Sequence, residues 1–198
     1  EKNYNNEIGL PKTLFQLTAD HEACVVEMGM RGLGQIAELV DIGEPTIGVV
    51  TNVGKSHIEL LGSQENIAKA KSELVQGLDA NGTAILNGDD PFVAPMQDLC
   101  QGRSILYGTG ESAHIRAENI VCDEKGVRFT CHCFDRTFDV SVPVIGRHNV
   151  YNALAAIAAG YVTGLSDSEL QAGLSAYRGM AMRQELLHLG PYTFINDT

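Results

Sequence analysis

Residues 46–86 read TIGVVTNVGKSHIELLGSQENIAKAKSELVQGLDANGTAIL, and this stretch decides the fold. Short apolar runs at 46–50 and 83–86 predict two buried strands, and the pattern between them predicts a helix over 65–78. Two buried strands joined through a helix are typical of parallel pairing, because the connection must return along the sheet before the next strand begins. The stretch therefore predicts an α/β fold.

The same alternation of strand and helix continues on either side of this stretch. Before it, residues 22–28 predict a buried strand, and a glycine-rich turn leads into a helix through 36–40. After it, residues 91–99 predict a short helix and 104–107 another strand. Short, uninterrupted apolar strands that alternate with helices are typical of a parallel sheet. We therefore expect an α/β fold with a mostly parallel sheet and helices on both of its faces.

From 114 to 142 the pattern changes to closely spaced strands around a turn at 123–126, which predicts a small antiparallel β meander. Within it, Cys131 and Cys133 flank His132, and such a grouping could bind a metal. Alternate residues of a strand share one face, and the spacing is not that of a zinc clamp. Two small thiols buried in the core are therefore the simpler interpretation.

The last third of the chain returns to helical spacing. An apolar stripe predicts a helix over 149–162, and Ser166 with Glu169 three residues later predicts a capped helix over 166–177. Two strand-like runs follow within 184–195. A turn at Gly190-Pro191 separates these two runs.

Charge and cysteine content limit the classes of partner and compartment. A net charge of −11 over 198 residues argues against nucleic acid and anionic membranes as partners, since both require clustered Lys and Arg. No apolar run approaches the roughly 20 residues that a membrane span needs. Five cysteines without paired spacing are typical of a reducing compartment, so we expect a cytoplasmic protein.

Two polar residues follow expected strands. Glu27 ends the strand expected at 22–28, and His57 follows the one expected at 46–50. Open α/β sheets bind ligands beyond the carboxyl ends of their strands, so both side chains point toward one crevice in this interpretation. A strand-end Glu alone is more often a helix-capping or solvated residue, and a single His in a loop is usually solvated. Together the two residues make a metal–phosphate site as well supported as that simpler interpretation.

Three further residues have a plain structural interpretation, and for the two asparagines among them a functional one is also open. The pattern of the helix over 65–78 makes Lys71 a surface lysine. Asn149 and Asn152 are three residues apart, so they share one helix face. Asn149 suits a helix N-cap, and the paired amides also offer the donor and acceptor that read the edge of adenine.

Taken together, these residues resemble the central domain of a Mur ligase. The motifs that carry the resemblance are Asn5-Asn6-Glu7-Ile8-Gly9-Leu10-Pro11, Glu27-Met28-Gly29-Met30-Arg31-Gly32, Thr51-Asn52-Val53-Gly54 with His57-Ile58-Glu59, Ile67-Ala68-Lys69-Ala70-Lys71-Ser72-Glu73, Asn87-Gly88-Asp89-Asp90-Pro91, and Gly146-Arg147-His148-Asn149 with Asn152-Ala153-Leu154-Ala155-Ala156. The resemblance implies a P-loop NTPase-like fold and an ATP- and Mg²⁺-dependent ligase of peptidoglycan synthesis. The forms NNEIGLP and KAKSEL favour a member that adds D-Ala-D-Ala to UDP-N-acetylmuramoyl-tripeptide.

The resemblance also implies roles for single residues. Glu27 and His57 are expected to help hold magnesium, together with Lys71 once CO₂ has converted its amine to a carbamate. Lys69 is expected to face elsewhere on the helix, which makes it a control for Lys71.

The remaining implied roles concern nucleotide and substrate. Asn149 and Asn152 are expected to contact adenine, and Arg183 and Asp197 the ribose or phosphates. Asn5 and Asn6 are expected to contact substrate, and the likeness also implies a monomer.

The resemblance further implies a division of the chain. We expect residues 1–180 to be the central, ATP-binding domain of a larger enzyme and residues 181–198 to be its junction with the first strands of a C-terminal domain. The family's G-x-x-G-K-[ST] phosphate loop does not occur in these 198 residues. Its backbone amides and lysine cradle the phosphates of ATP, so the chain by itself is expected to be inactive.

Two other functions remain open at this stage. One is a ligase of the same fold with another amino-acid acceptor, including those that act on folate or cyanophycin. The other is a non-catalytic nucleotide-binding or scaffolding domain. A scaffold has no need of Glu27, His57 and Lys71 together, so we expect a ligase.

Overall fold

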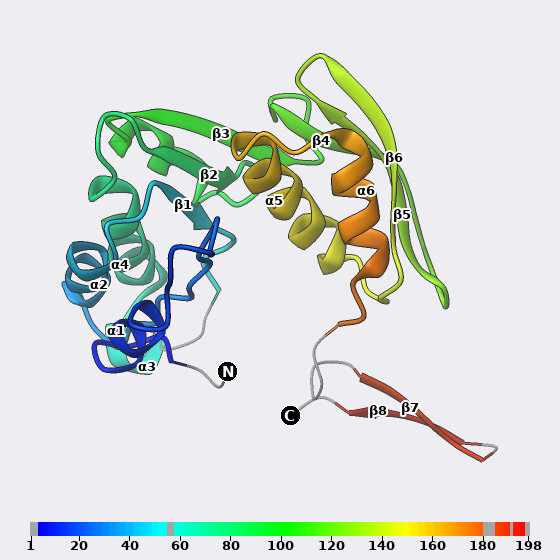
Figure 1. The fold of residues 1–198 in the computed structure, drawn as a ribbon, viewed down its shortest axis with the longest axis horizontal. Coiled ribbons are helices and arrows are strands. Elements are labelled where there is room, and N and C mark those ends of the chain that lie inside the picture. The colour runs from blue at the N-terminus through cyan, green and yellow to red at the C-terminus, as the bar shows by residue number, and fades with distance from the viewer. Residues whose placement is uncertain (1–3, 55–57, 180–184, 191, 197–198) are drawn as a thin grey trace. The chain divides into compact units, whose positions relative to one another are not determined.

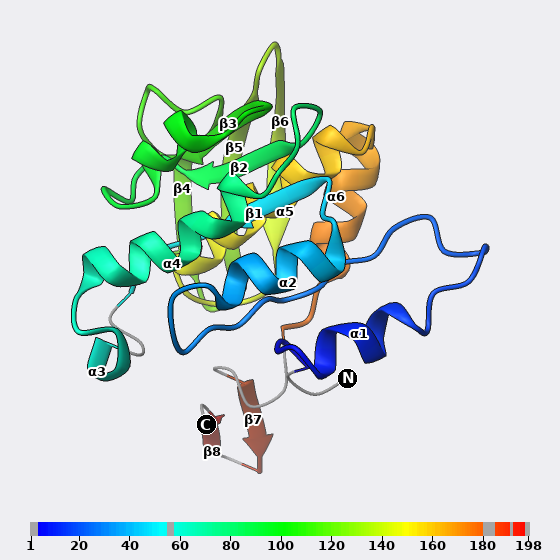
Figure 2. The same cartoon turned by 90° about the vertical axis from the view of Figure 1, so that its left-hand side faces the viewer.

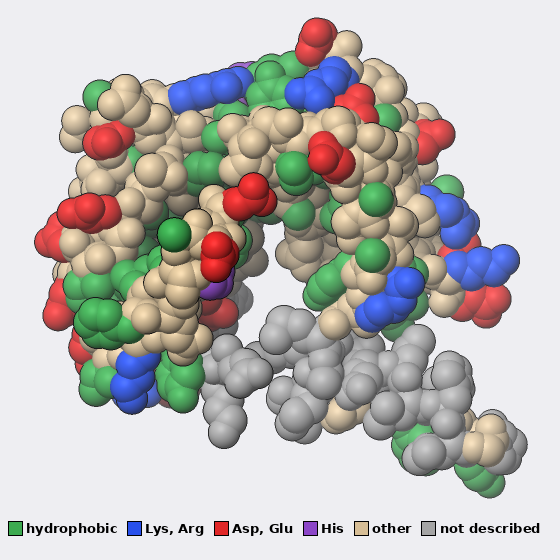
Figure 3. All heavy atoms as spheres, viewed as in Figure 1, with side chains coloured by type: hydrophobic (Ala, Val, Ile, Leu, Met, Phe, Trp, Pro, Cys, Tyr) green, Lys and Arg blue, Asp and Glu red, His purple; other side chains and the backbone are tan. Residues whose placement is uncertain are grey.

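The computed structural model describes residues 4–54, 58–179, 185–190 and 192–196. It divides into two compact units, Glu1–Leu106 and Tyr107–Thr198, which Figure 1 colours from blue to green and from green to red. Strand β3 (Arg103–Gly108) runs across the division. On the face drawn in Figure 3, acidic and basic side chains lie as separate groups scattered over the surface.

The first unit contains a parallel strand pair and the helices around it. Its helices are α1 (Gly9–Leu14), α2 (Gln35–Gly43), α3 (Ile58–Leu61), α4 (Gln64–Gln76) and the 3₁₀ helix η1 (Ala94–Leu99). Strands β1 (Ile47–Val50) and β2 (Thr83–Asn87) pair in parallel, with Ile47 opposite Thr83 and Val50 opposite Leu86. The elements predicted over 46–107 are therefore confirmed to within a few residues.

Helix α4 forms where its sequence predicts it. The side chain of Ser63 accepts the backbone N–H of Asn66 at 3.2 Å and caps the helix. Ile67, Ala70 and Val75 form the buried stripe, and Ile67 and Val75 share a core cluster with residues of both strands and of η1. Every residue of β2 is buried, so the sheet is covered on both faces at this strand.

Helices α1, α2 and α4 pack on one another. Leu10, Leu39 and Val40 form a buried cluster, and Leu74 of α4 packs against it. Figure 2 shows α2 lying beside α4. This packing brings the glycine-rich segment that precedes α2 close to the helix that carries Lys71.

The expected strand over 22–28 is wrong. These residues form no strand, and Val25 is 95% exposed. β1 is also not buried on both faces, since Val49 is 37% exposed. A strand requires a neighbour for its backbone hydrogen bonds, and residues 22–28 pair with no described strand, which leaves β1 as the edge strand of the described sheet.

The second unit is built on the predicted antiparallel meander. Its elements are β4 (Ile115–Asp123), β5 (Gly126–Cys133), β6 (Arg136–Val142), α5 (His148–Val162), α6 (Asp167–Ala176), β7 (Glu185–Leu189) and β8 (Tyr192–Asn196). Strand β4 pairs in parallel with β3 and antiparallel with β5, which pairs antiparallel with β6. The sheet order is therefore β1-β2-β3-β4-β5-β6, and β7–β8 form a separate hairpin.

The meander packs against helices on its buried face. Helix α5 contacts β4 and β5, and α6 contacts β6 (Figure 1). Cys131 and Cys133 are 0% and 1% exposed, which confirms that they belong to the core. Ser166 and Glu169 form the predicted capping box of α6. Among the described residues, every helix is too short or too polar to span a membrane.

Candidate active site

The first two motifs of the chain meet in the structure. Nδ2 of Asn5 donates a hydrogen bond to Oε1 of Glu27 at 2.9 Å, and the backbone N–H of Gly29 donates to the carbonyl of Asn5 at 2.7 Å. Asn5 is half-buried and Glu27 is exposed. The carboxylate of Glu27 is thus oriented by an amide that lies 22 residues away in the chain.

Asn6 has a local structural contact instead. Its Oδ1 accepts the backbone N–H groups of Ile8 at 3.2 Å and Gly9 at 2.8 Å. Both amides lie at the start of α1, where backbone N–H groups have no hydrogen-bond partner within the helix. The side chain of Asn6 therefore supports the beginning of α1, while Asn5 faces Glu27.

Lys71 lies on α4 and is half-buried, whereas Lys69 is exposed on the same helix. Nζ of Lys71 donates to the carbonyl of Asn52 at 2.6 Å. Burial lowers the pKa of Lys71, and the carboxylate of Asp90 opposes that shift. The two lysines thus occupy different environments, and Lys71 is half-buried rather than the surface lysine that the helical pattern made it.

Residues of the motif after β2 hold the loop whose carbonyl accepts the hydrogen bond from Lys71. Nδ2 of Asn87 donates to the carbonyl of Thr51 at 2.9 Å, and Oδ2 of Asp90 accepts the N–H of Val53 at 2.8 Å. Asn87 is buried, with 8% of its surface exposed. Asn87 and Asp90 therefore hold the segment that leads from β1 toward residues 55–57.

Sequence reasoning missed the role of Glu73. Its Oε1 accepts the N–H of Gly34 at 2.7 Å, and its Oε2 accepts the N–H of Ala37 at 3.1 Å. Both amides lie at the start of α2, where a carboxylate also interacts favourably with the helix dipole. The only signal in the sequence is an acidic residue two positions after Lys71, which does not reveal its partners.

Three predicted site residues, His57, Arg183 and Asp197, lie outside the described residues. Within the described ranges, no hydrogen bond or ion pair joins Glu27 to Lys71. The same ranges contain no cluster of three or more His, Cys, Asp or Glu side chains suited to a metal. The structure therefore brings Asn5 to Glu27, and Lys71 to the loop before residue 55, as two separate groups.

The predicted asparagine pair is formed, but not with the predicted cap. Helix α5 begins at His148 with Arg147 at the N-cap position, so Asn149 lies inside the first turn. Its Nδ2 donates to the carbonyl of Ile145 at 2.7 Å, and its Oδ1 accepts Nδ2 of Asn152 at 3.1 Å. The N-cap interpretation of Asn149 is wrong, because the preceding turn already continues into the helix.

Among the described residues no ready-made magnesium site exists, and those that could contribute to one are Glu27 and, once modified, Lys71. Hard cations favour oxygen ligands, and an ammonium group would repel them. A carbamate on Nζ replaces that positive charge with two oxygens, and the reaction requires a neutral amine. The burial that lowers the pKa of Lys71 favours that form. Glu27 supplies a further carboxylate, already oriented by Asn5.

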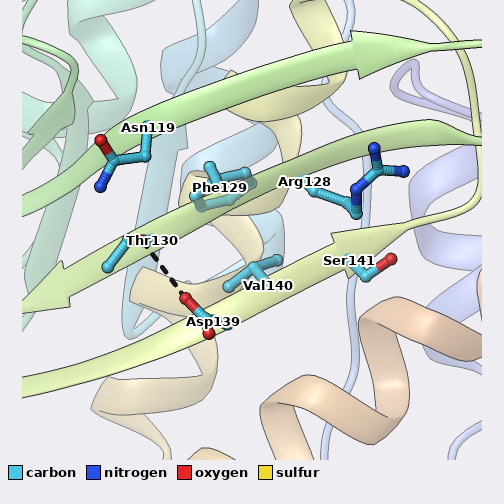
Figure 4. A pocket seen from close by; sticks show the side chains of 7 residues that line it. All are labelled: Asn119, Arg128, Phe129, Thr130, Asp139, Val140 and Ser141. Atoms are coloured by element: carbon cyan, nitrogen blue, oxygen red, sulfur yellow. Dashed lines mark hydrogen bonds between the residues drawn. The ribbon is translucent and has the colours of Figure 1, made fainter.

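The meander has a surface hollow whose lining residues are distant in the sequence from all of these groups. It has a volume of about 290 Å³, and Arg128, Thr130 and Asp139 are among the residues that line it (Figure 4). Oγ1 of Thr130 donates to Asp139 at 3.2 Å across the hollow. None of the predicted site residues lines it, so it is not the candidate active site.

Comparison with known proteins agrees with the motifs. The Mur ligase middle domain family matches residues 1–160. UDP-N-acetylmuramoyl-tripeptide–D-alanyl-D-alanine ligase of Bacillus subtilis is 40% identical over 196 residues, which are 98% of this chain and 42% of that protein. This chain therefore spans about two fifths of the length of that relative.

Solved structures give the same result for the fold. MurF from Acinetobacter baumannii matches with a TM-score of 0.94 at 29% identity, over 100% of this chain and 44% of that one. MurF ligase from Thermotoga maritima, in complex with ADP, matches with a TM-score of 0.86 at 23% identity, over 100% of this chain and 46% of that one. With its motifs, its fold and most of its length matched, the chain belongs to the Mur ligase family.

Proposed function

We propose that the full-length protein is an ATP-dependent ligase that joins D-Ala-D-Ala to UDP-N-acetylmuramoyl-tripeptide. The single observation that carries this proposal is the 40% identity, over nearly the whole chain, to a ligase of that name. In the proposed reaction the tripeptide carboxylate attacks the γ-phosphorus of ATP, which forms an acyl phosphate and releases ADP. The amine of the dipeptide then attacks the acyl carbon, an amide bond forms, and phosphate leaves with loss of a proton.

The chain's own residues serve this reaction mainly by positioning charge. Glu27, His57 and a carbamate on Lys71 would hold magnesium, which neutralises negative charge on the phosphates when bound. Asn5 orients Glu27 through the 2.9 Å hydrogen bond. Asn5 would therefore serve substrate binding partly indirectly, by holding the carboxylate of Glu27 in place. Asn6 would reach substrate only from the turn that it already stabilises.

Asn149 and Asn152 are proposed to bind the adenine ring, and Arg183 and Asp197 the ribose or phosphates. Nδ2 of Asn149 already donates to the carbonyl of Ile145, and Oδ1 accepts from Asn152. Asn152, the outer amide of the pair, is exposed and would make the larger share of the contact with adenine. An Asn152→Ala variant should raise the KM for ATP more than it lowers kcat.

We also propose that residues 1–180 are the ATP-binding domain and 181–198 the junction with a further domain. The 198-residue chain by itself should be inactive, because its sequence has no G-x-x-G-K-[ST] loop to bind phosphates. Calorimetry should detect at most weak binding of Mg·ATP to the chain alone. Micromolar affinity would contradict this part of the proposal.

The choice of acceptor is tested by competition. The full-length protein is given Mg·ATP, UDP-N-acetylmuramoyl-tripeptide and an equimolar mixture of D-Ala-D-Ala and single amino acids, and the products are identified by mass spectrometry. Addition of the dipeptide supports the proposal, while addition of a single amino acid would assign the protein to another ligase of the fold. We further propose a cytoplasmic monomer, and light scattering of the full-length protein tests its oligomeric state.

A further inference from the structure

One peptide group lies between Lys71 and Asp90. The carbonyl oxygen of the peptide that joins Asn52 to Val53 accepts Nζ of Lys71 at 2.6 Å. The N–H of the same peptide group donates to Oδ2 of Asp90 at 2.8 Å. No described peptide bond is cis, and in a trans peptide the C=O and N–H point in opposite directions. Lys71 and Asp90 therefore contact opposite sides of one rigid planar group.

The carboxylate of Asp90 is itself fixed in place. Its Oδ1 accepts the backbone N–H groups of Phe92 at 2.9 Å and Val93 at 3.2 Å. Val53 and Val93 are buried, with 5% and 0% of their surfaces exposed. Both oxygens of Asp90 are thus used by backbone amides, so besides its charge, which favours the ammonium form of Lys71, the carboxylate acts on Lys71 through the peptide group between them.

We propose that Asp90 is a positioning residue for Lys71, acting through the Asn52–Val53 peptide group. The inference rests on the proposed function, because it takes Lys71 as the lysine that carries a carbamate. A carboxylate that accepts an N–H increases the negative charge on the carbonyl oxygen of the same peptide, and hydrogen bonds in a chain strengthen one another by about 10–30%. Asp90 therefore makes the carbonyl of Asn52 a stronger and better-oriented acceptor for the nitrogen of Lys71.

The same contact would persist after carbamylation. The ammonium group loses one proton, the neutral amine adds to CO₂, and a second proton leaves as the carbamate forms. The carbamate nitrogen keeps one hydrogen, and the carbonyl of Asn52 accepts it. Because that hydrogen has a fixed acceptor, the plane and direction of the carbamate group are fixed relative to the 51–53 loop. Asp90 thereby determines the direction in which the oxygens of the modified lysine face.

The test compares three variants of the full-length protein. Asp90→Asn keeps Oδ1 for Phe92 and Val93 but places an amide in front of the N–H of Val53. Gln64→Ala removes a different contact to the same loop, the 3.2 Å hydrogen bond from Nε2 to the carbonyl of Val53. Asp98→Asn removes one exposed negative charge from η1 and controls for net charge.

The main readout is the ¹³C signal of the carbamate after incubation with ¹³C-bicarbonate, followed by phosphate release under ligation conditions. Asp90→Asn also removes a charge that favours the ammonium form of Lys71. If orientation through the peptide group dominates, as proposed, the variant should still reduce carbamate occupancy about tenfold, the scale on which residues that orient a ligand act. Raised bicarbonate should restore part of the signal and part of the activity. Gln64→Ala and Asp98→Asn should keep both near the wild-type level.

Two outcomes would overturn the inference. One is an Asp90→Asn protein with wild-type carbamate signal and activity, and the other is a Gln64→Ala protein that loses as much as Asp90→Asn. A fully active Lys71→Ala protein would instead contradict the proposed role of Lys71, so the two failures are distinguishable. If Asp90→Asn does not fold, the amide ¹H shift of Val53 in the wild-type protein decides: it should move as bicarbonate is added, and no movement would contradict the inference.

Discussion

Asn5 and Glu27 are joined by a 2.9 Å hydrogen bond from Nδ2 to Oε1, and the N–H of Gly29 returns a second bond to the carbonyl of Asn5. Two motifs that are 22 residues apart thus form one structural group. The orientation of Glu27, a proposed metal ligand, therefore depends on the side chain of Asn5. Changes at Asn5 or Gly29 should therefore act through Glu27.

Gly29→Ala should weaken this group without removing any of its polar atoms. A Cβ at residue 29 would lie 2.9 Å from Cγ and Nδ2 of Asn5, which is too close for the side chain to stay in place. In the full-length ligase the Mg²⁺ concentration for half-maximal activity should rise about tenfold, as it does when a group that orients a metal ligand is lost. Gly32→Ala is the matched control, since nothing lies within 4 Å of its Cβ position. Equal effects from the two alanines would contradict the account.

Lys71→Ala should lower the rate of ligation by at least about 100-fold, the usual scale for loss of one placed electrostatic group. Lys69→Ala should leave the rate within about twofold, because an exposed helix lysine contributes little. The measurement is phosphate release by the full-length protein at saturating substrates. A Lys71→Ala protein that retains its rate would remove the main residue of the proposed site.

Glu73→Ala should loosen the start of α2. The N–H groups of Gly34 and Ala37 lose their acceptors, since amides in the first turn of a helix have no partner within it. Loss of such a cap costs about 1 kcal/mol, which corresponds to roughly fivefold faster amide exchange. Hydrogen exchange at these two amides is the measurement, with Lys69→Ala as the control on the same helix. Unchanged protection at both amides would show that Glu73 does not cap α2.

Cys131 should resist alkylation in the folded protein. Burial raises the pKa of its thiol from 9.0 to about 12, whereas Cys24 and Cys122 are exposed. Mass spectrometry after brief iodoacetamide treatment at pH 8 should find Cys24 and Cys122 modified and Cys131 unmodified until the protein is unfolded. Rapid modification of Cys131 would contradict its place in the core.

The same thiol predicts a dependence of stability on alkaline pH. The pKa is higher in the folded than in the unfolded state, so the unfolded protein loses its proton first as pH rises. The contribution of the buried thiol is therefore fully present below pH 9 and is lost as pH rises toward 12. A Cys131→Val variant should lose less stability over this interval than the wild-type protein.

The parts of the fold that local sequence determines were predictable. Helix α4 has its apolar stripe and its Ser63 cap within one continuous segment, and the Ser166–Glu169 capping box spans only four residues. The segment 22–28 has the composition of a strand, but composition does not supply the neighbour that a strand requires. That information lies in the pairing of segments rather than in the segment itself.

The candidate site shows the same limit. Helical spacing predicts that Lys71 and Lys69 face different directions, but the helical pattern also makes Lys71 a surface lysine, whereas it is half-buried. The contacts of Glu73 and Asp90 join segments 36 or more residues apart, and both end on backbone amides. Backbone groups are the same at every residue, so no side-chain pattern reveals that these two carboxylates are used by the main chain.

The central claim is that this chain belongs to a ligase that adds D-Ala-D-Ala to UDP-N-acetylmuramoyl-tripeptide. The most direct test is phosphate release by the full-length protein with Mg·ATP and the tripeptide substrate, with and without the dipeptide. The account predicts release that depends on D-Ala-D-Ala and is lost in Lys71→Ala. Release that requires a single amino acid instead, or no release with any acceptor, would contradict it.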